Sequence, residues 1–232
     1  ILANRGGLLA FDVGVGQTYT GLAVLSRARQ EGWCKRPVVL DAGHGGKDLG
    51  AVRRGTGMEK DLALAITLKV RDRLEKDGIP TRLTRDADVF VPLDRRIKDS
   101  IDWDGSVFVS LHLNQERNKK ADGIEVYAFG AERSRRFRRR LRHSLPWLPA
   151  PPREARAASA ELASGLVRTL RTGGFEVEPV NKAAFYVLKN PKLPSVLVEL
   201  GYLSNADEAK RLADPIYQEK LADTIAAGLR DY

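Results

Sequence analysis

Two histidines occupy positions where a folded chain could bring them together. His44 lies in the glycine-rich turn Gly43–Gly46, directly after the apolar run Val38–Asp41. His112 follows a second apolar run, Val107–Leu111. If both runs are buried strands of one sheet, the two imidazoles can meet at its edge, although they are 68 residues apart. Neutral imidazole suits zinc, so the pair indicates a metal site unless the two are unrelated polar residues at strand ends.

Two glutamates strengthen the metal hypothesis. Glu59 begins the helical pattern that follows the His44 turn, where an acid is also favoured by the helix dipole alone. Glu199 ends an apolar strand pattern, where a charged group is costly unless a site or a salt bridge uses it. Two histidines and one glutamate match the three protein ligands of a catalytic zinc site, and a second glutamate supplies the base that the attacking water needs.

The elements that must position these residues alternate between strands and helices. Apolar runs predict strands at Pro37–Asp41, Ile79–Thr84, Ser106–Leu111, Gly123–Phe129 and Ser195–Glu199, and helical spacing predicts helices at Asp61–Lys76, Leu93–Ile101, Ala155–Arg171 and Pro215–Leu229. This order is typical of an α/β domain with a mostly parallel sheet covered on both faces. In such sheets the working residues gather at the carboxyl ends of the strands.

Five motifs in this order resemble the catalytic domain of the zinc-dependent N-acetylmuramoyl-L-alanine amidases of bacteria, the Amidase_3 family. The resemblance covers about Pro37 to Leu229, and the motifs are Val38–Ala51, Glu59–Asp61, Leu83–Asp86, Val109–Asn114 and Pro194–Asn205. It implies that one zinc ion is bound by His44, Glu59 and His112, and that Glu199 is the catalytic glutamate. It also implies a mixed, mainly parallel six-stranded sheet with flanking helices.

The implied reaction is hydrolysis of peptidoglycan. Zinc-activated water, with Glu199 as general acid and base, would cleave the amide bond between the lactyl group of N-acetylmuramic acid and the L-alanine of the stem peptide. Met58, Leu113 and Leu200 depart from residues common in the family, which bears on substrate fit and removes no ligand. Asn114 is a candidate for substrate binding, and Asp41 or Asp61 for orienting a ligand imidazole, if these residues are not ordinary turn and capping residues.

Composition sets the broader expectations. The chain has 232 residues with a formal net charge of +9, and no apolar run of about 18 residues predicts a membrane span. Cys34 is the one cysteine, so neither an internal disulfide nor a cysteine-based zinc site is possible. Residues 1–36 are interpreted as an appendix or the end of a preceding domain, and residues 37–232 as the catalytic domain. The chain begins with Ile1, which suggests a processed or shortened form.

A basic and proline-rich insertion at about 130–156 interrupts the α/β pattern. The run Arg133–Arg142 precedes His143 and the proline-rich stretch Pro146–Pro152, and the strand before it should end near the metal edge. We expect an exposed arm that binds anionic wall polymers or a membrane surface. An inhibitory plug, displaced by a regulatory protein, and a neutral insertion are the alternatives.

We expect a monomer that acts in the periplasm or cell wall, because peptidoglycan lies there. A zinc carboxypeptidase or other deacylase, a binding module without turnover, and a nucleic-acid-binding protein are the competing functions. The last lacks a recognition module beside its basic run, so no specific nucleic-acid binding is expected.

Overall fold

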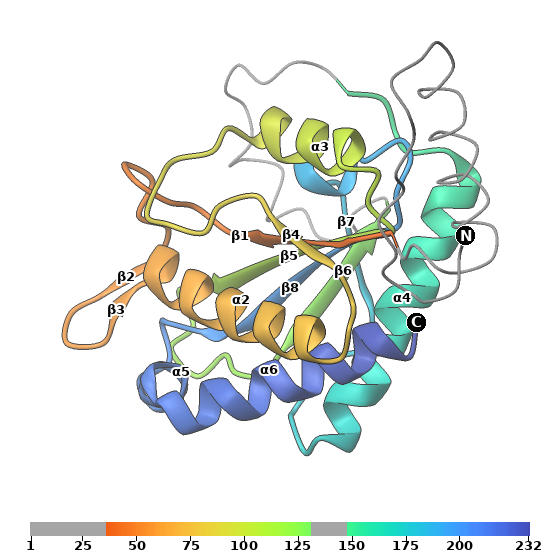
Figure 1. Cartoon of the computed structure of the whole chain (residues 1–232). Coiled ribbons are helices and arrows are strands. Elements are labelled where there is room, and N and C mark those ends of the chain that lie inside the picture. Colours follow the sequence, from red (N-terminus) through yellow and green to blue (C-terminus); the bar gives the residue numbers. More distant parts are fainter. Residues whose placement is uncertain (1–35, 131–147) are drawn as a thin grey trace, which may run out of the picture. The chain divides into compact units, whose positions relative to one another are not determined.

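The computed structural model describes residues 36–130 and 148–232 (Figure 1). The predicted N-terminal appendix, apart from Arg36, therefore lies outside the described residues. So do the run Arg133–Arg142 and the residues Cys34 and His143. No helix in the two described ranges is long and apolar enough to cross a membrane.

A six-stranded mixed sheet forms the centre of the domain, in the order β4-β1-β5-β8-β6-β7. The first four strands are parallel, β6 is antiparallel to β8, and β7 is parallel to β6. The predicted α/β class and the mostly parallel six-stranded sheet are thus confirmed. The strands are β4 (Thr81–Leu83), β1 (Val38–Ala42), β5 (Val107–Asn114), β8 (Ser195–Tyr202), β6 (Glu125–Phe129) and β7 (Asn181–Ala183).

Helices cover both faces of this sheet (Figure 1). The larger core packs one face against three helices, α2 (Glu59–Lys76), α4 (Arg153–Thr172) and α6 (Pro215–Arg230). The smaller core packs the other face against α3 (Leu93–Asp102) and the short helix η2 (Tyr186–Leu188). The remaining elements are α5 (Ala206–Ala213), which packs on β8 and α6, and a hairpin of β2 (Val52–Arg53) and β3 (Gly57–Met58).

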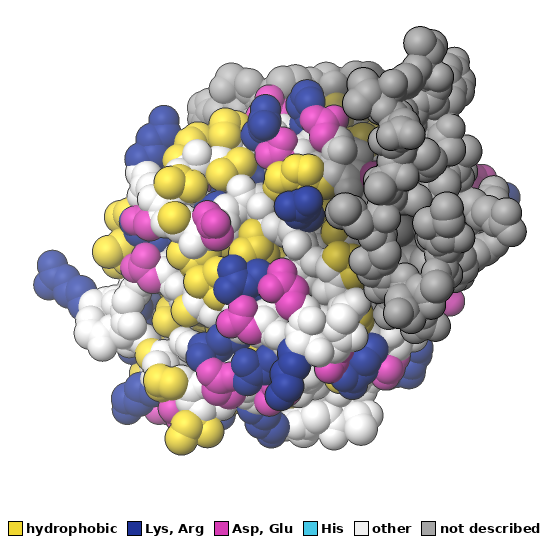
Figure 2. All heavy atoms as spheres, in the orientation of Figure 1, with side chains coloured by type: hydrophobic (Ala, Val, Ile, Leu, Met, Phe, Trp, Pro, Cys, Tyr) yellow, Lys and Arg dark blue, Asp and Glu magenta, His cyan; other side chains and the backbone are white. Residues whose placement is uncertain are grey.

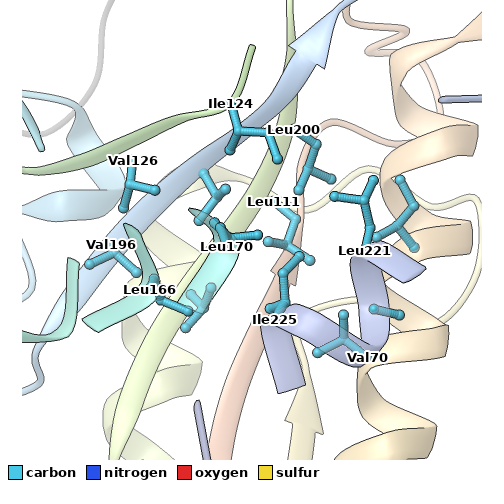
Figure 3. Packing of buried hydrophobic residues seen from close by; sticks show 14 of the residues in the cluster. Val70, Leu111, Ile124, Val126, Leu166, Leu170, Val196, Leu200, Leu221 and Ile225 are labelled. Atoms are coloured by element: carbon cyan, nitrogen blue, oxygen red, sulfur yellow. The ribbon is translucent and has the colours of Figure 1, made fainter. Parts of the chain in front are cut away.

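Strand alternation decides which face of the sheet each candidate site residue occupies. In Figure 3, Leu111 of β5, Val126 of β6 and Leu200 of β8 contribute to the larger core, beside Leu166 of α4 and Ile225 of α6. Successive side chains of a strand point to opposite faces. The neighbours of these apolar residues, including His112 and Glu199, therefore lie on the other face of the sheet.

The predicted position of one strand end was wrong. The strand Gly123–Phe129 was expected to end near the metal edge, but β6 is antiparallel to β8, so Glu125 pairs with Glu199 while Ala128 pairs with Val196. The amino end of β6 lies at the sheet edge that carries His112 and Glu199. Its carboxyl end, and with it the start of the basic insertion, lies at the opposite edge of the sheet. An apolar strand pattern carries no information on strand direction.

A buried ion pair lies beneath the carboxyl end of β1. Asp41 is fully buried and Arg96 is 2% exposed, and Arg96 Nη1 lies 2.5 Å from Asp41 Oδ1. The hydroxyls of Thr84 and Ser110 also donate to the Asp41 carboxylate. Burial works against ionisation of Asp41, but the guanidinium and the two hydroxyls outweigh it, so the pKa of Asp41 lies below its usual value.

Replacing Arg96 by methionine should destabilise the fold strongly. Removing one partner leaves a buried, uncompensated charge, which costs about 3–5 kcal/mol in the free energy of unfolding. Denaturant titration at neutral pH measures this. Because the lowered pKa makes Asp41 stabilising only while it is ionised, the difference from wild type should shrink as the pH falls below the usual carboxyl range.

Lys98→Met supplies the matched control on the same helix. Lys98 is 62% exposed and pairs with Asp102 on the surface, so its loss should cost less than about 1 kcal/mol. If the two variants lose equal stability, the buried pair does not have the importance assigned to it.

Candidate metal centre

Three separate elements bring His44, Glu59 and His112 together. His44 lies in the turn after β1, Glu59 is the first residue of α2, and His112 is near the carboxyl end of β5. One possible ligand atom from each residue lies within 4.8 Å of the other two. Within the described residues this is the one group of at least three histidine, cysteine or acidic side chains that could hold a metal ion.

The Glu59 carboxylate is the centre of this group. Its Oε1 lies 3.0 Å from His44 Nε2 and 2.9 Å from His112 Nδ1, and it also accepts from the Leu113 N–H at 3.1 Å. Its Oε2 accepts from the Ala51 N–H at 2.7 Å. Glu59 is 5% exposed, so these contacts supply nearly all of its polar surroundings.

The chemistry of this donor set fits zinc. Two imidazole nitrogens and one carboxylate oxygen are a known catalytic ligand set with room for a fourth, non-protein ligand. A tetrahedral ion with bonds of about 2.1 Å separates its ligand atoms by about 3.4 Å. The nitrogens lie 3.0 Å and 2.9 Å from Glu59 Oε1, so a small outward movement would accommodate the ion.

The ionised carboxylate of Glu59 and the protonated imidazole of His44 stabilise each other. Burial opposes ionisation of Glu59, but hydrogen bonds from His112 and His44 outweigh it and hold the pKa of the carboxyl well below its usual range. Burial likewise opposes protonation of His44, but Glu59 and Asp48 raise the pKa of its imidazole above the usual value. A metal ion would have to displace this proton, so its affinity should weaken as the pH falls.

The turn that carries His44 is held in an unusual conformation. His44 has φ +59°, a left-handed value that is uncommon for a residue with a side chain. Arg96 stabilises it by donating to the His44 carbonyl at 2.7 Å and to the Ala42 carbonyl at 2.7 Å. Gly43 is required because a Cβ there would lie 2.4 Å from the His112 ring. The buried ion pair of Asp41 and Arg96 therefore holds the turn that carries His44, in addition to stabilising the core.

Glu199 lies beside the metal group on the neighbouring strand. β5 and β8 are adjacent, and Glu199 is the direct partner of His112. Both residues lie on the sheet face opposite the larger core, and Glu199 is half-buried. A carboxylate and three ligand-type residues therefore share one edge of the sheet, where His112 and Glu199 also share one face.

The other candidate residues lie around this group without touching the ligand atoms. Asn114 donates from Nδ2 to Glu125 Oε2 at 2.9 Å. Asp61 is exposed on the first turn of α2, where its charge acts on Arg85. Asp41 is occupied by its hydrogen bonds with Arg96, Thr84 and Ser110. Neither aspartate is placed to orient a ligand imidazole.

Asp48, which the sequence did not indicate, is a neighbour of a ligand-type histidine. Its Oδ2 lies 2.9 Å from His44 Nδ1, the ring nitrogen that faces away from Glu59. A carboxylate on the second nitrogen of a ligand histidine fixes its tautomer and orientation. The spacing of four residues in a tight turn was the available signal, but Asp48 resembles an ordinary turn aspartate in sequence.

Comparison with known proteins gives consistent results. A family model described as N-acetylmuramoyl-L-alanine amidase matches residues 38–231. N-acetylmuramoyl-L-alanine amidase AmiA of Escherichia coli is 34% identical over 228 residues, covering 85% of this chain and 76% of the relative.

Two solved structures show the same fold. AmiC2 of Nostoc punctiforme is 34% identical with a TM-score of 0.71, covering 86% of this chain and 97% of that one. The CwlD amidase of Clostridioides difficile, solved in complex with the GerS lipoprotein, is 30% identical with a TM-score of 0.66, covering 85% and 98%.

Replacing Asp48 by alanine should weaken zinc binding roughly tenfold, because loss of such an outer carboxylate typically costs 10- to 100-fold in metal affinity. Competition with a chromophoric chelator measures the affinity without reference to turnover. Asp61→Ala is the matched control, since it removes an aspartate of the same region that does not contact a ligand. Equal affinities in the two variants would remove Asp48 from the site.

Proposed function

The chain belongs to the N-acetylmuramoyl-L-alanine amidase family and is a peptidoglycan hydrolase, and we propose that it works with a zinc ion bound by His44, Glu59 and His112. The observation that carries this proposal is the convergence of these three side chains at one sheet edge, with Glu199 on the adjacent strand. The bond cleaved joins the lactyl carbonyl of N-acetylmuramic acid to the L-alanine nitrogen.

The chemistry divides between the ion and the chain. Zinc in this group would polarise the scissile carbonyl and activate the attacking water. Glu199 accepts a proton from that water and returns it to the L-alanine nitrogen as the carbon–nitrogen bond breaks. Both protons of the water end on that nitrogen, which leaves a lactyl carboxylate and an ammonium. Asp48 and Arg96 keep His44 oriented during the reaction.

The substrate places the work of the protein outside the cytoplasmic membrane. We propose export to the periplasm or cell wall, since peptidoglycan is found there. A regulatory protein is a further proposal, supported by the complex of the similar CwlD amidase with a lipoprotein.

The positive charge of the chain is concentrated in one segment of its sequence. Residues 131–147 contain seven arginines and one acidic residue, so they account for about two thirds of the net charge of +9. On the face shown in Figure 2, basic and acidic side chains are interspersed. We propose that the Arg133–Arg142 run binds anionic wall polymers. The start of the insertion at the sheet edge opposite the metal group supports an arm over a plug.

Glu199→Gln should retain the fold and zinc but reduce kcat about 100-fold or more. Glutamine is nearly the same size but cannot accept the water's proton, and general acid–base catalysis contributes about 10²–10⁴-fold. Turnover of a soluble muropeptide, zinc content and the unfolding midpoint are measured together. Undiminished hydrolysis with zinc bound would contradict the role of Glu199.

Replacing the seven arginines of residues 131–147 by glutamine should weaken retention on purified cell wall. The affinity of this variant for cell wall should also depend less on the salt concentration, because salt weakens binding by screening surface charges. Hydrolysis of a small soluble muropeptide should stay at the wild-type rate. A several-fold higher rate would identify the segment as a plug, and unchanged wall retention would identify a neutral insertion.

A further inference from the structure

A second carboxylate lies directly across the sheet from Glu199. Glu125, near the amino end of β6, is the antiparallel partner of Glu199, which in turn pairs with His112. The neighbours Ile124 and Val126 belong to the larger core, so the side chain of Glu125 lies on the same face as the metal group. His112, Glu199 and Glu125 thus form one row across three adjacent strands.

Like charges directly opposite on a sheet are unfavourable, so this position requires compensation. Glu125 Oε2 accepts from Asn114 Nδ2 and from the Tyr127 hydroxyl, each at 2.9 Å, and Oε1 lies 3.3 Å from Asn181 Nδ2. These donors come from β5, β6 and β7. The carboxylate is therefore fixed from three strands while it remains half-buried beside Glu199.

A β-bulge brings a further hydroxyl to Glu125. Between the pairs His112–Glu199 and Asn114–Tyr202, β8 contains one residue more than β5, and Gly201 has φ +143° in that stretch. The extra residue brings Tyr202 to the level of Asn114. Burial, followed by the Glu125 carboxylate, raises the pKa of both Tyr127 and Tyr202, so their hydroxyls stay protonated and can donate.

The order of the strands places Glu125 on the side of Glu199 that lies away from His112. The three ligand-type residues lie on the β5 side of Glu199, and Glu125 lies on the β6 side. When the scissile carbonyl is at the metal group and its nitrogen is at Glu199, the leaving peptide can continue over β6. There it meets a fixed negative charge, which favours N–H and ammonium groups and disfavours carboxylates.

We propose that Glu125 binds the amino end of the stem peptide, accepting a hydrogen bond from the L-alanine N–H before cleavage and pairing with its ammonium afterwards. This inference rests on the proposed function of the site. It makes Glu125 a specificity-determining residue on the leaving-group side of the bond, supported by Asn114 and Tyr127.

Product binding tests the proposal without any turnover. The probes are L-alanyl-γ-D-glutamyl-L-lysine with a free amino terminus and the same peptide with that terminus acetylated. Calorimetry on the zinc-loaded chain should show about tenfold tighter binding of the free amine, because a hydrogen bond between charged groups is lost on acetylation. Glu125→Gln should reduce this preference several-fold, and Glu199, which also lies at the nitrogen, accounts for what remains.

Three variants separate recognition from structure. Glu125→Asp keeps the charge and should retain part of the preference. Glu161→Gln removes an exposed carboxylate from α4, which covers the other face, and should retain all of it. Tyr127→Phe removes one donor but not the charge, so it should weaken the preference without abolishing it. Unfolding midpoints show whether each variant is folded.

Kinetics with a soluble muropeptide give a second readout. Glu125→Gln should raise KM by a larger factor than it lowers kcat, whereas Glu199→Gln should act mainly on kcat. Equal binding of the two peptides by the wild-type chain, or an undiminished preference in Glu125→Gln, would overturn the proposal. If the zinc-loaded chain cleaves no muropeptide, the proposed function fails instead, and the two failures are distinguishable.

Discussion

The site depends on a buried carboxylate that needs several partners at once. Glu59 is almost inaccessible to water, and a buried charge is tolerated only when it is paired and hydrogen-bonded. Two imidazoles and the backbone N–H groups of Ala51 and Leu113 meet that need. The same contacts tie α2 to the glycine-rich turn and to β5. A metal ion bound here would reinforce a constraint that already joins three elements.

The sheet places further polar side chains near this buried carboxylate. Alternation directs Leu111, Val126 and Leu200 into the larger core and leaves the opposite face free for polar residues near the carboxyl ends of the parallel strands. The antiparallel β6 adds a carboxylate from a strand that begins at this edge rather than ending there. Glu199 therefore has a polar neighbour on each side, His112 on β5 and Glu125 on β6. With the four parallel strands alone, it would have a neighbour on one side only.

Apolar patterns in the sequence predicted most of the scaffold, and four residues at strand and helix ends, two histidines and two glutamates, indicated the site. The patterns missed β7 and the β2–β3 hairpin, because strands of two or three residues carry too little periodicity. They also missed α5, which follows the Asn205 cap. Asp48 and Glu125 escaped notice for a different reason. Their proposed roles rest on contacts made by the turn geometry and by the direction of β6, which local sequence does not encode.

Digestion of purified peptidoglycan in heavy-oxygen water tests the central claim most directly. The zinc-loaded chain should release stem peptides with a new amino terminus at L-alanine and without label. The new oxygen should appear in the lactyl carboxylate of N-acetylmuramic acid, because water attacks that carbonyl. Label in a peptide carboxyl group would show a peptidase, and label on a sugar carbon would show a glycosidase. Either result would contradict the account.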